Sequence, residues 1–84
     1  MDQATALANS IVDYLNGRGN LVVKPYELSL IKTDLDETFP EMSFAFDFRK
    51  NKFRIVCFSN NFNIWIDATD GEARFLTYEE VKVG

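Results

Sequence analysis

The chain has 84 residues, of which 46% are hydrophobic and 26% are charged, and its formal net charge at pH 7 is −4. This composition is typical of a folded globular chain and excludes an intrinsically disordered one, and the length predicts a single domain over residues 1–84. The negative net charge disfavours non-specific binding to nucleic acid, and for the same reason we expect no membrane partner.

The first predicted element is an amphipathic helix over residues 4–16, capped by Asp2 and followed by a loop that begins near Gly17. Its apolar side chains recur at steps of three and four: Ala4, Leu7, Ala8, Ile11 and Leu15, with Val12 widening the stripe. Such a stripe occupies one face of a helix, so the pattern predicts that this helix packs on a sheet.

The next segment, residues 21–32, has the composition of an extended strand. Pro25 cannot donate a ladder hydrogen bond, so the segment is predicted to be an edge strand, with two short kinked strands as the alternative. Residues 33–42 are acidic and include Phe39-Pro40. They are predicted to form a loop, with at most one helical turn after a Thr33 or Asp34 cap.

The C-terminal half reads as three consecutive hairpins. Their turn centres are predicted at Lys50-Asn51, Asn60-Asn61 and Asp70-Gly71, because Asn and Gly tolerate the backbone conformations of tight turns. The resulting register collects the following residues on one face: Phe44, Phe46, Phe48, Phe53, Ile55, Cys57, Ile64, Ile66 and Phe75. On the other face it aligns a row of alternating charge made by Asp47, Arg54, Asp67 and Arg74.

Beyond the charged row, the same register places large apolar side chains on the face away from the helix. One row holds Ala45, Val56, Trp65 and Leu76, and the next holds Ser43, Phe58, Asn63 and Tyr78. A solvated face would not have this composition. Either the first strand, the acidic loop with Leu35 and Phe39, or the C-terminal tail covers these rows, or they form a surface for protein binding or self-association. In a third interpretation, nucleic-acid bases stack on Phe58, Trp65 and Tyr78, but the acidic character of the chain disfavours it.

A second candidate surface is the basic hairpin tip, which holds Arg49, Lys50, Lys52 and Arg54. Its simplest interpretation is a solvated turn whose charges oppose aggregation. Its functional interpretation is an electropositive site for an acidic partner or a phosphate group.

The sequence predicts no catalytic, metal or cofactor site. It contains no histidine and one cysteine, Cys57, which excludes a thiolate zinc site and a thiol activated by histidine. The four glycines form no phosphate-binding loop, and the residues around Asp70-Gly71 lack the carboxylate spacing of a calcium loop. The lone cysteine and the absence of a long apolar run predict a soluble, cytoplasmic protein.

Together these patterns predict an α+β fold, in which one N-terminal helix packs on a mainly antiparallel sheet of about five strands that ends in a β-meander. By elimination we expect a small non-enzymatic module that binds a larger protein partner, as inhibitors, immunity-type proteins and adaptors do. Small acidic chains without a cofactor are common among phage and mobile-element proteins. The alternative is a homodimer or larger homo-oligomer that associates through the sheet face that carries Trp65. A sheet that binds single-stranded nucleic acid is a weaker alternative. The candidate binding residues are Val56, Phe58, Trp65, Leu76, Tyr78, Arg49, Lys50 and Lys52.

Overall fold

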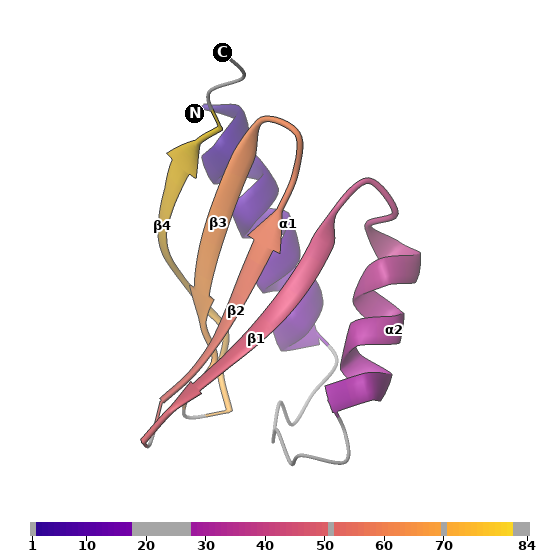
Figure 1. Ribbon diagram of the computed structural model, residues 1–84, viewed down its shortest axis with the longest axis vertical. Helices are drawn as coiled ribbons and strands as arrows, with labels where there is room; N and C mark the ends of the chain where they lie inside the picture. Colours follow the sequence, from indigo (N-terminus) through magenta and orange to yellow (C-terminus); the bar gives the residue numbers. More distant parts are fainter. Residues whose placement is uncertain (1, 18–27, 51, 70, 82–84) are drawn as a thin grey trace.

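The computed structural model describes residues 2–17, 28–50, 52–69 and 71–81. In these residues two helices precede four strands, and the strands form one antiparallel sheet in the order β1-β2-β3-β4 (Figure 1). The elements are α1 (Gln3–Gly17), α2 (Leu28–Thr38), β1 (Ser43–Arg49), β2 (Lys52–Phe58), β3 (Phe62–Asp67) and β4 (Arg74–Glu80). The α+β class and the C-terminal meander are confirmed, but the sheet has four strands among the described residues and not five.

The end of the segment that was predicted to be an edge strand forms a helix instead. Residues 28–38 form α2, so the extended prediction is wrong for residues 28–32 and the loop prediction is wrong for residues 33–38, while residues 18–27 lie outside the described part of the chain. Ile31 and Leu35 are four residues apart and both are buried. The prediction failed because this helical spacing crosses the boundary between two segments that had been interpreted separately.

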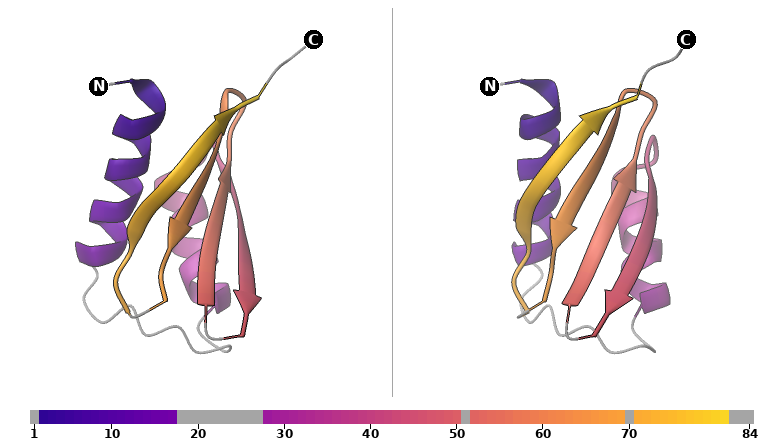
Figure 2. Two further views of the ribbon diagram at one scale, coloured as in Figure 1. Left: turned by 90° about the vertical axis from the view of Figure 1, so that its left-hand side faces the viewer. Right: turned by 60° about the vertical axis from the view of Figure 1, so that its left-hand side comes forward.

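Helix α1 agrees with its sequence pattern. Its cap is Asp2, whose Oδ1 accepts a 2.7 Å hydrogen bond from the backbone N–H of Thr5. The four side chains of the stripe that are fully buried are Ala4, Ala8, Ile11 and Leu15. The helix packs across β3 and β4, whereas α2 packs beside β1. Both helices therefore lie on the same side of the sheet, and Figure 2 shows this arrangement in two views.

The core lies between the helices and the sheet face that they cover, which we call the inner face. The fully buried strand residues Ile55, Cys57, Ile64 and Ile66 form its centre. Phe48, which the register also assigns to this face, is 50% exposed. It belongs to the end of the β1–β2 hairpin that extends beyond α1 (Figure 1), so its ring contacts Phe53 instead, with the two ring centres 4.5 Å apart.

The predicted register is confirmed for the first two hairpins and for the start of the third. Phe46 pairs with Ile55, Ile55 with Ile66, and Ile66 with Phe75. A β-bulge then follows between Trp65 and Ile66, and Leu76 is the additional residue in β4. Beyond the bulge every β4 partner is displaced by one position.

Two of the turn predictions can be checked against backbone angles. Lys50 and Gly71 have φ values of 53° and 77°, so both residues adopt the left-handed conformation that tight hairpin turns require. Asn51 and Asp70, which complete these two turn centres, lie outside the described residues.

Candidate functional site

The outer face of the sheet, opposite the helices, is not covered by any described helix (Figure 2). Leu35 and Phe39 do not fold over it, because Leu35 is fully buried in the core and the ring of Phe39 packs against Tyr14 and Phe44 on the inner face. The predicted alternative in which these two residues cover the outer face is therefore wrong. Residues 21–27 and 82–84, the remaining candidates for a cover, lie outside the described residues.

The centre of the outer face is a shallow apolar groove next to Trp65. We call it the Trp65 groove; its volume is about 490 Å³, and it is lined by Arg54, Trp65, Leu76, Thr77, Tyr78 and Glu79. Trp65 and Val56 are direct cross-strand partners and are half-buried. Leu76 and Phe58 are 45% and 42% exposed, so a large part of their apolar surface is in contact with solvent.

One predicted binding residue belongs to the inner face. Because of the bulge, Tyr78 pairs with Ile64 and not with Asn63, and its ring packs against Phe62 and Phe75. The Tyr78 hydroxyl donates a 3.4 Å hydrogen bond to Oδ2 of Asp2, at the start of α1. The negative charge of Asp2 is the main reason why the pKa of Tyr78 is raised. Tyr78 thus borders the groove, but its ring packs on the inner face and its hydroxyl contacts the start of α1.

The charged row has the predicted order, but its neighbouring members do not form ion pairs with one another. Arg54 has Asp47 and Asp67 as its cross-strand partners. However, Asp47 pairs with Arg49 at 3.2 Å, and Oδ1 of Asp67 accepts a 2.6 Å hydrogen bond from the hydroxyl of Thr69. Arg54 forms no salt bridge with any described residue, and its buried Nε has no hydrogen-bond partner there.

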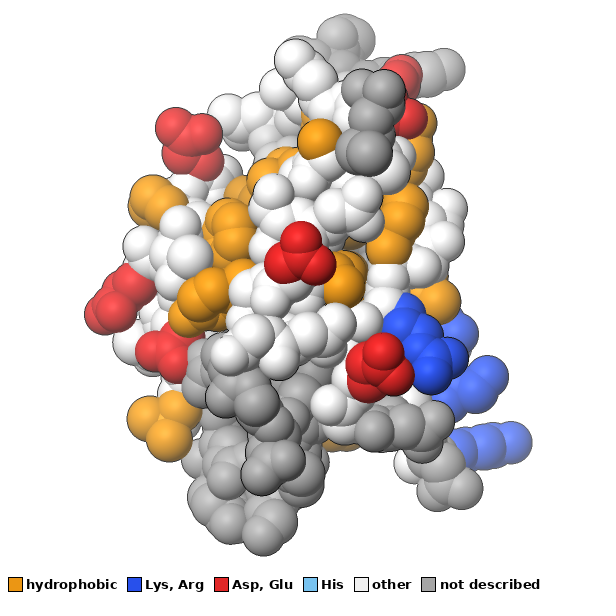
Figure 3. Space-filling model, turned by 180° about the vertical axis from the view of Figure 1, so that it is seen from behind, with side chains coloured by type: hydrophobic (Ala, Val, Ile, Leu, Met, Phe, Trp, Pro, Cys, Tyr) orange, Lys and Arg blue, Asp and Glu red, His pale blue; other side chains and the backbone are white. Residues whose placement is uncertain are grey.

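The basic tip is exposed except at Arg54, which is half-buried. Arg49, Lys50 and Lys52 are all exposed, and Arg49, Lys52, Arg54 and Asp47 line a hollow of about 200 Å³, which we call the tip hollow. In the space-filling view Lys and Arg side chains gather at one end of the molecule (Figure 3). Four of the described Lys and Arg residues therefore belong to the tip, and one of them, Arg54, also lines the Trp65 groove.

The lone cysteine is part of the core. Cys57 is fully buried, and burial raises the pKa of its thiol to about 12. The thiol therefore stays protonated at neutral pH, which is the unreactive form of a cysteine.

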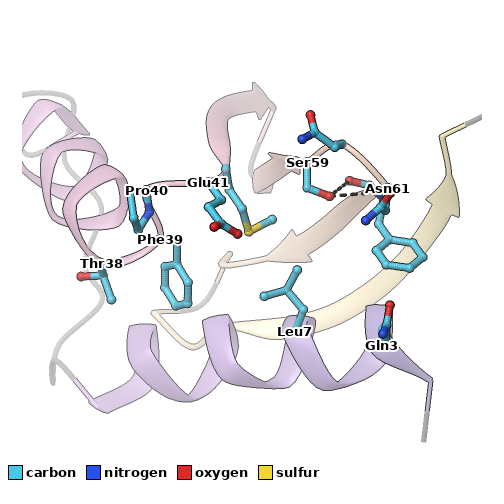
Figure 4. A pocket seen from close by; sticks show the side chains of 11 residues that line it. Gln3, Leu7, Thr38, Phe39, Pro40, Glu41, Ser59 and Asn61 are labelled. Carbon is cyan, nitrogen blue, oxygen red and sulfur yellow. Dashed lines mark hydrogen bonds between the residues drawn. The ribbon is translucent and has the colours of Figure 1, made fainter. Parts of the chain in front are cut away.

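A separate cleft of about 520 Å³ lies on the inner face, at the end of the sheet away from the basic tip. It is bounded by the start of α1, the residues after α2 and the β2–β3 turn (Figure 4). Apolar side chains in it come from Leu7, Phe39, Pro40, Met42 and Phe62, and polar ones from Gln3, Thr38, Glu41, Ser59, Asn60 and Asn61. No pattern in the sequence predicts this cleft, because its walls come from three segments that are distant in the chain.

The cleft lacks the fixed polar groups that orient a ligand. The Ser59 hydroxyl donates to the Phe62 carbonyl and accepts from the Phe62 N–H, at 2.8 and 2.9 Å, so it already closes its own turn. No polar or charged side chain is buried in the described part of the chain. Ligand sites combine an apolar wall with a few precisely placed polar groups, and only the first is present here.

Comparisons with known proteins give no relative, since no family model, no curated protein and no solved structure matches the chain. In the described ranges no group of three or more His, Cys, Asp or Glu is arranged to bind a metal ion. Neither of the described helices is long and apolar enough to cross a membrane.

Proposed function

We propose that the protein is a small non-enzymatic binding module whose outer sheet face docks on a larger protein partner, in the manner of an inhibitor, an immunity-type protein or an adaptor. The observation that carries this proposal is the Trp65 groove on a sheet face that the described helices leave uncovered. Contiguous exposed apolar surface with a charged border is typical of protein-binding sites.

The residue types on this face also favour a protein partner. Trp and Arg are the side chains that most often dominate binding energy, and Trp65 and Arg54 line the same groove. Leu76 provides an exposed apolar contact beside them. Asp47 and Asp67 lie in the row between the groove and the basic tip, which makes the surface unfavourable for the continuous negative charge of a nucleic acid.

A pair of leucine variants tests the proposal. Leu76 on the outer face and Leu30 on α2 are both exposed, at 45% and 63%, so Leu→Ala makes the same chemical change at two exposed sites of the molecule. The tagged chain is purified from cells that produce it, and the affinity of each co-purified protein is then measured by calorimetry. We expect Leu76→Ala to weaken binding about tenfold or more, and Leu30→Ala to leave it unchanged.

Three results would overturn this assignment. Equal affinity for the parent, the Leu76→Ala variant and the Trp65→Ala variant would show that binding uses another surface. A concentration-dependent dimer in light scattering that Leu76→Ala abolishes would assign the face to self-association. Tight binding to single-stranded nucleic acid that falls steeply as the salt concentration rises would replace the protein partner with a phosphate backbone.

A further inference from the structure

Arg54 is an outer-face residue whose side chain lacks hydrogen-bond acceptors among the described residues. It lies at the centre of the charged row, yet both neighbouring carboxylates interact elsewhere, Asp47 with Arg49 and Asp67 with Thr69. Its Nε is buried and has no hydrogen-bond partner among the described residues. A buried donor without an acceptor is unfavourable, so an incoming oxygen atom that accepts from Arg54 would gain an interaction that the free protein lacks.

Arg54 also connects the two hollows of the outer face. It lines the tip hollow together with Arg49 and Lys52, and it lines the Trp65 groove together with Trp65 and Leu76. The fourth side chain that lines the tip hollow is Asp47, which is paired with Arg49, so three cationic groups and one carboxylate leave this hollow with a net positive charge, whereas the Trp65 groove is mainly apolar. A ligand that occupies both hollows needs a negative group and an apolar group in close succession.

The spacing of the strands sets the distance between these two groups. Trp65 is the cross-strand partner of Val56, which follows Arg54 by two residues in β2. Neighbouring strands lie about 4.8 Å apart and this offset along the strand is about 6.6 Å, so the backbone of Trp65 is about 8 Å from that of Arg54. Residues i and i+2 of an extended peptide point to the same side and are about 6.6 Å apart. An extended segment can therefore place a carboxylate at Arg54 and an apolar side chain beside Trp65.

Building on the proposed function, we propose that the partner presents an extended acidic segment in which Glu or Asp alternates with large apolar residues, and that its carboxylate binds Arg54. The guanidinium matches a carboxylate in shape and charge and can donate two parallel hydrogen bonds to it. The exposed Lys50 and Lys52 add positive charge around the same position and attract an acidic segment from solution.

The first experiment uses a defined probe, a capped peptide with the sequence Leu-Ser-Glu-Ser-Leu-Ser-Glu, and a second peptide in which Gln replaces each Glu. Because Trp65 is the only tryptophan of the chain, its fluorescence reports occupation of the groove. The N–H signal of the Arg54 Nε in NMR spectra reports the carboxylate contact. We expect the Glu peptide to shift both signals and to bind about tenfold more tightly than the Gln peptide.

Arginine variants of the full chain provide the matched comparison. Arg54→Gln should remove most of the preference for the Glu peptide, so the two peptides should bind this variant with nearly equal affinity. Arg74→Gln is the control, because Arg74 belongs to the same charged row but is exposed and is paired with Glu72 at 3.3 Å. It should change the affinity for either peptide by less than about twofold, the scale expected of an exposed ion pair.

The results distinguish this inference from the function on which it rests. If both peptides shift the Trp65 signal with equal affinity, or if Arg54→Gln and Arg74→Gln weaken binding equally, the acidic segment is wrong while the binding face stands. If Leu76→Ala leaves partner binding unchanged, the proposed function itself fails. An oligothymidylate that binds more tightly than the Glu peptide and depends on Arg54 would overturn the choice of a protein segment.

Discussion

The two faces of the four-stranded sheet come from alternate residues of the same strands but differ in what completes them. The inner face is closed by α1 and α2, and the residues at its centre, such as Ile55 and Ile66, are fully buried. The outer face carries Trp65, Leu76 and Phe58, yet its residues remain half-buried or exposed. The inner face therefore supplies the fully buried core, whereas the described helices leave the outer face uncovered (Figure 2).

The two faces also differ in whether their polar groups have hydrogen-bond partners. On the inner side each terminus of α1 is fixed by hydrogen bonds, through Asp2 at its start and Asn16 at its end. On the outer side Arg54 has no acceptor among the described residues, although two carboxylates stand in the adjacent strands. Satisfied polar groups are typical of structural contacts, whereas an unsatisfied one in a native fold requires an explanation such as binding.

The largest effect is expected when the inner face is damaged. Ile66→Ala removes a fully buried side chain from the centre of the core, so the free energy of unfolding should fall by about 2–5 kcal/mol. Urea unfolding followed by circular dichroism measures this change. Val56→Ala is the outer-face control, and its cost should be below about 1.5 kcal/mol because Val56 is half-buried and does not pack against the core. Equal costs would mean that the outer face is a second core.

The contact that attaches α1 to the β3–β4 hairpin should give the next largest effect. The Asn16 side chain donates to the Ala73 carbonyl at 3.1 Å and accepts from the Ala73 N–H at 2.8 Å. Asn16→Ala leaves both backbone groups of a buried residue without partners, which should cost about 1–3 kcal/mol. The Ala73 amide should also exchange with solvent faster. Gln3→Ala, an exposed change on the same helix, should cost less than about 0.5 kcal/mol; a similar cost would show that Asn16 is not an anchor.

These contacts indicate which parts of the fold the sequence could predict. Helix α1 and the first two hairpins were predictable because their apolar residues repeat with a regular period over many positions. Helix α2 was missed because only Ile31 and Leu35 mark its buried side. The bulge at Leu76 was missed because Leu76 and Thr77 are both compatible with a position opposite Trp65, so the pattern does not show where the additional residue lies.

The candidate site was predictable to a similar degree. The side assigned to Trp65, Val56 and Leu76 follows from strand alternation, and the structure places all three on the outer face. The absence of an ion pair at Arg54 could not be predicted. It arises because the neighbouring carboxylates Asp67 and Asp47 bind Thr69 and Arg49 instead. Such competition is decided by side-chain conformation, which residue spacing alone does not specify.

A smaller effect on stability is expected at Trp65, even though this change removes the largest side chain. Trp65→Ala should lower the free energy of unfolding by about 1 kcal/mol, because the ring is half-buried and lies outside the core cluster. The same variant should weaken partner binding by about 2 kcal/mol or more, the scale of a binding hot spot. Thermal unfolding and calorimetry measure the two quantities. A loss of about 3–5 kcal/mol in stability, the usual cost for a buried Trp, would show that the face is covered.

The smallest effect concerns the link between α1 and β4, and it appears as a pH dependence. The pKa of Asp2 is lowered from its ordinary value of 3.8, mainly by the backbone hydrogen bond from Thr5. The contribution of ionised Asp2 to stability is therefore present above about pH 4 and is lost as the pH falls through the folded-state value. The pKa of Tyr78 is raised from 10.0, chiefly by the charge of Asp2. Its contribution to stability is therefore present below pH 10 and is lost as the pH rises through the folded-state value.

Asp2→Asn tests this link, because the variant keeps a capping oxygen but cannot titrate. The difference in melting temperature between the parent and Asp2→Asn should therefore be constant from pH 5 to about pH 9 and decrease on both sides, and circular dichroism at a series of pH values measures it. When the same comparison is made with Tyr78→Phe in both proteins, the alkaline decrease should disappear and most of the acid decrease should remain, because the contact with Thr5, the main cause of the lowered pKa of Asp2, is retained. A difference that does not vary between pH 2 and pH 11 would contradict the contact between the start of α1 and β4, and with it the assignment of Tyr78 to the inner face.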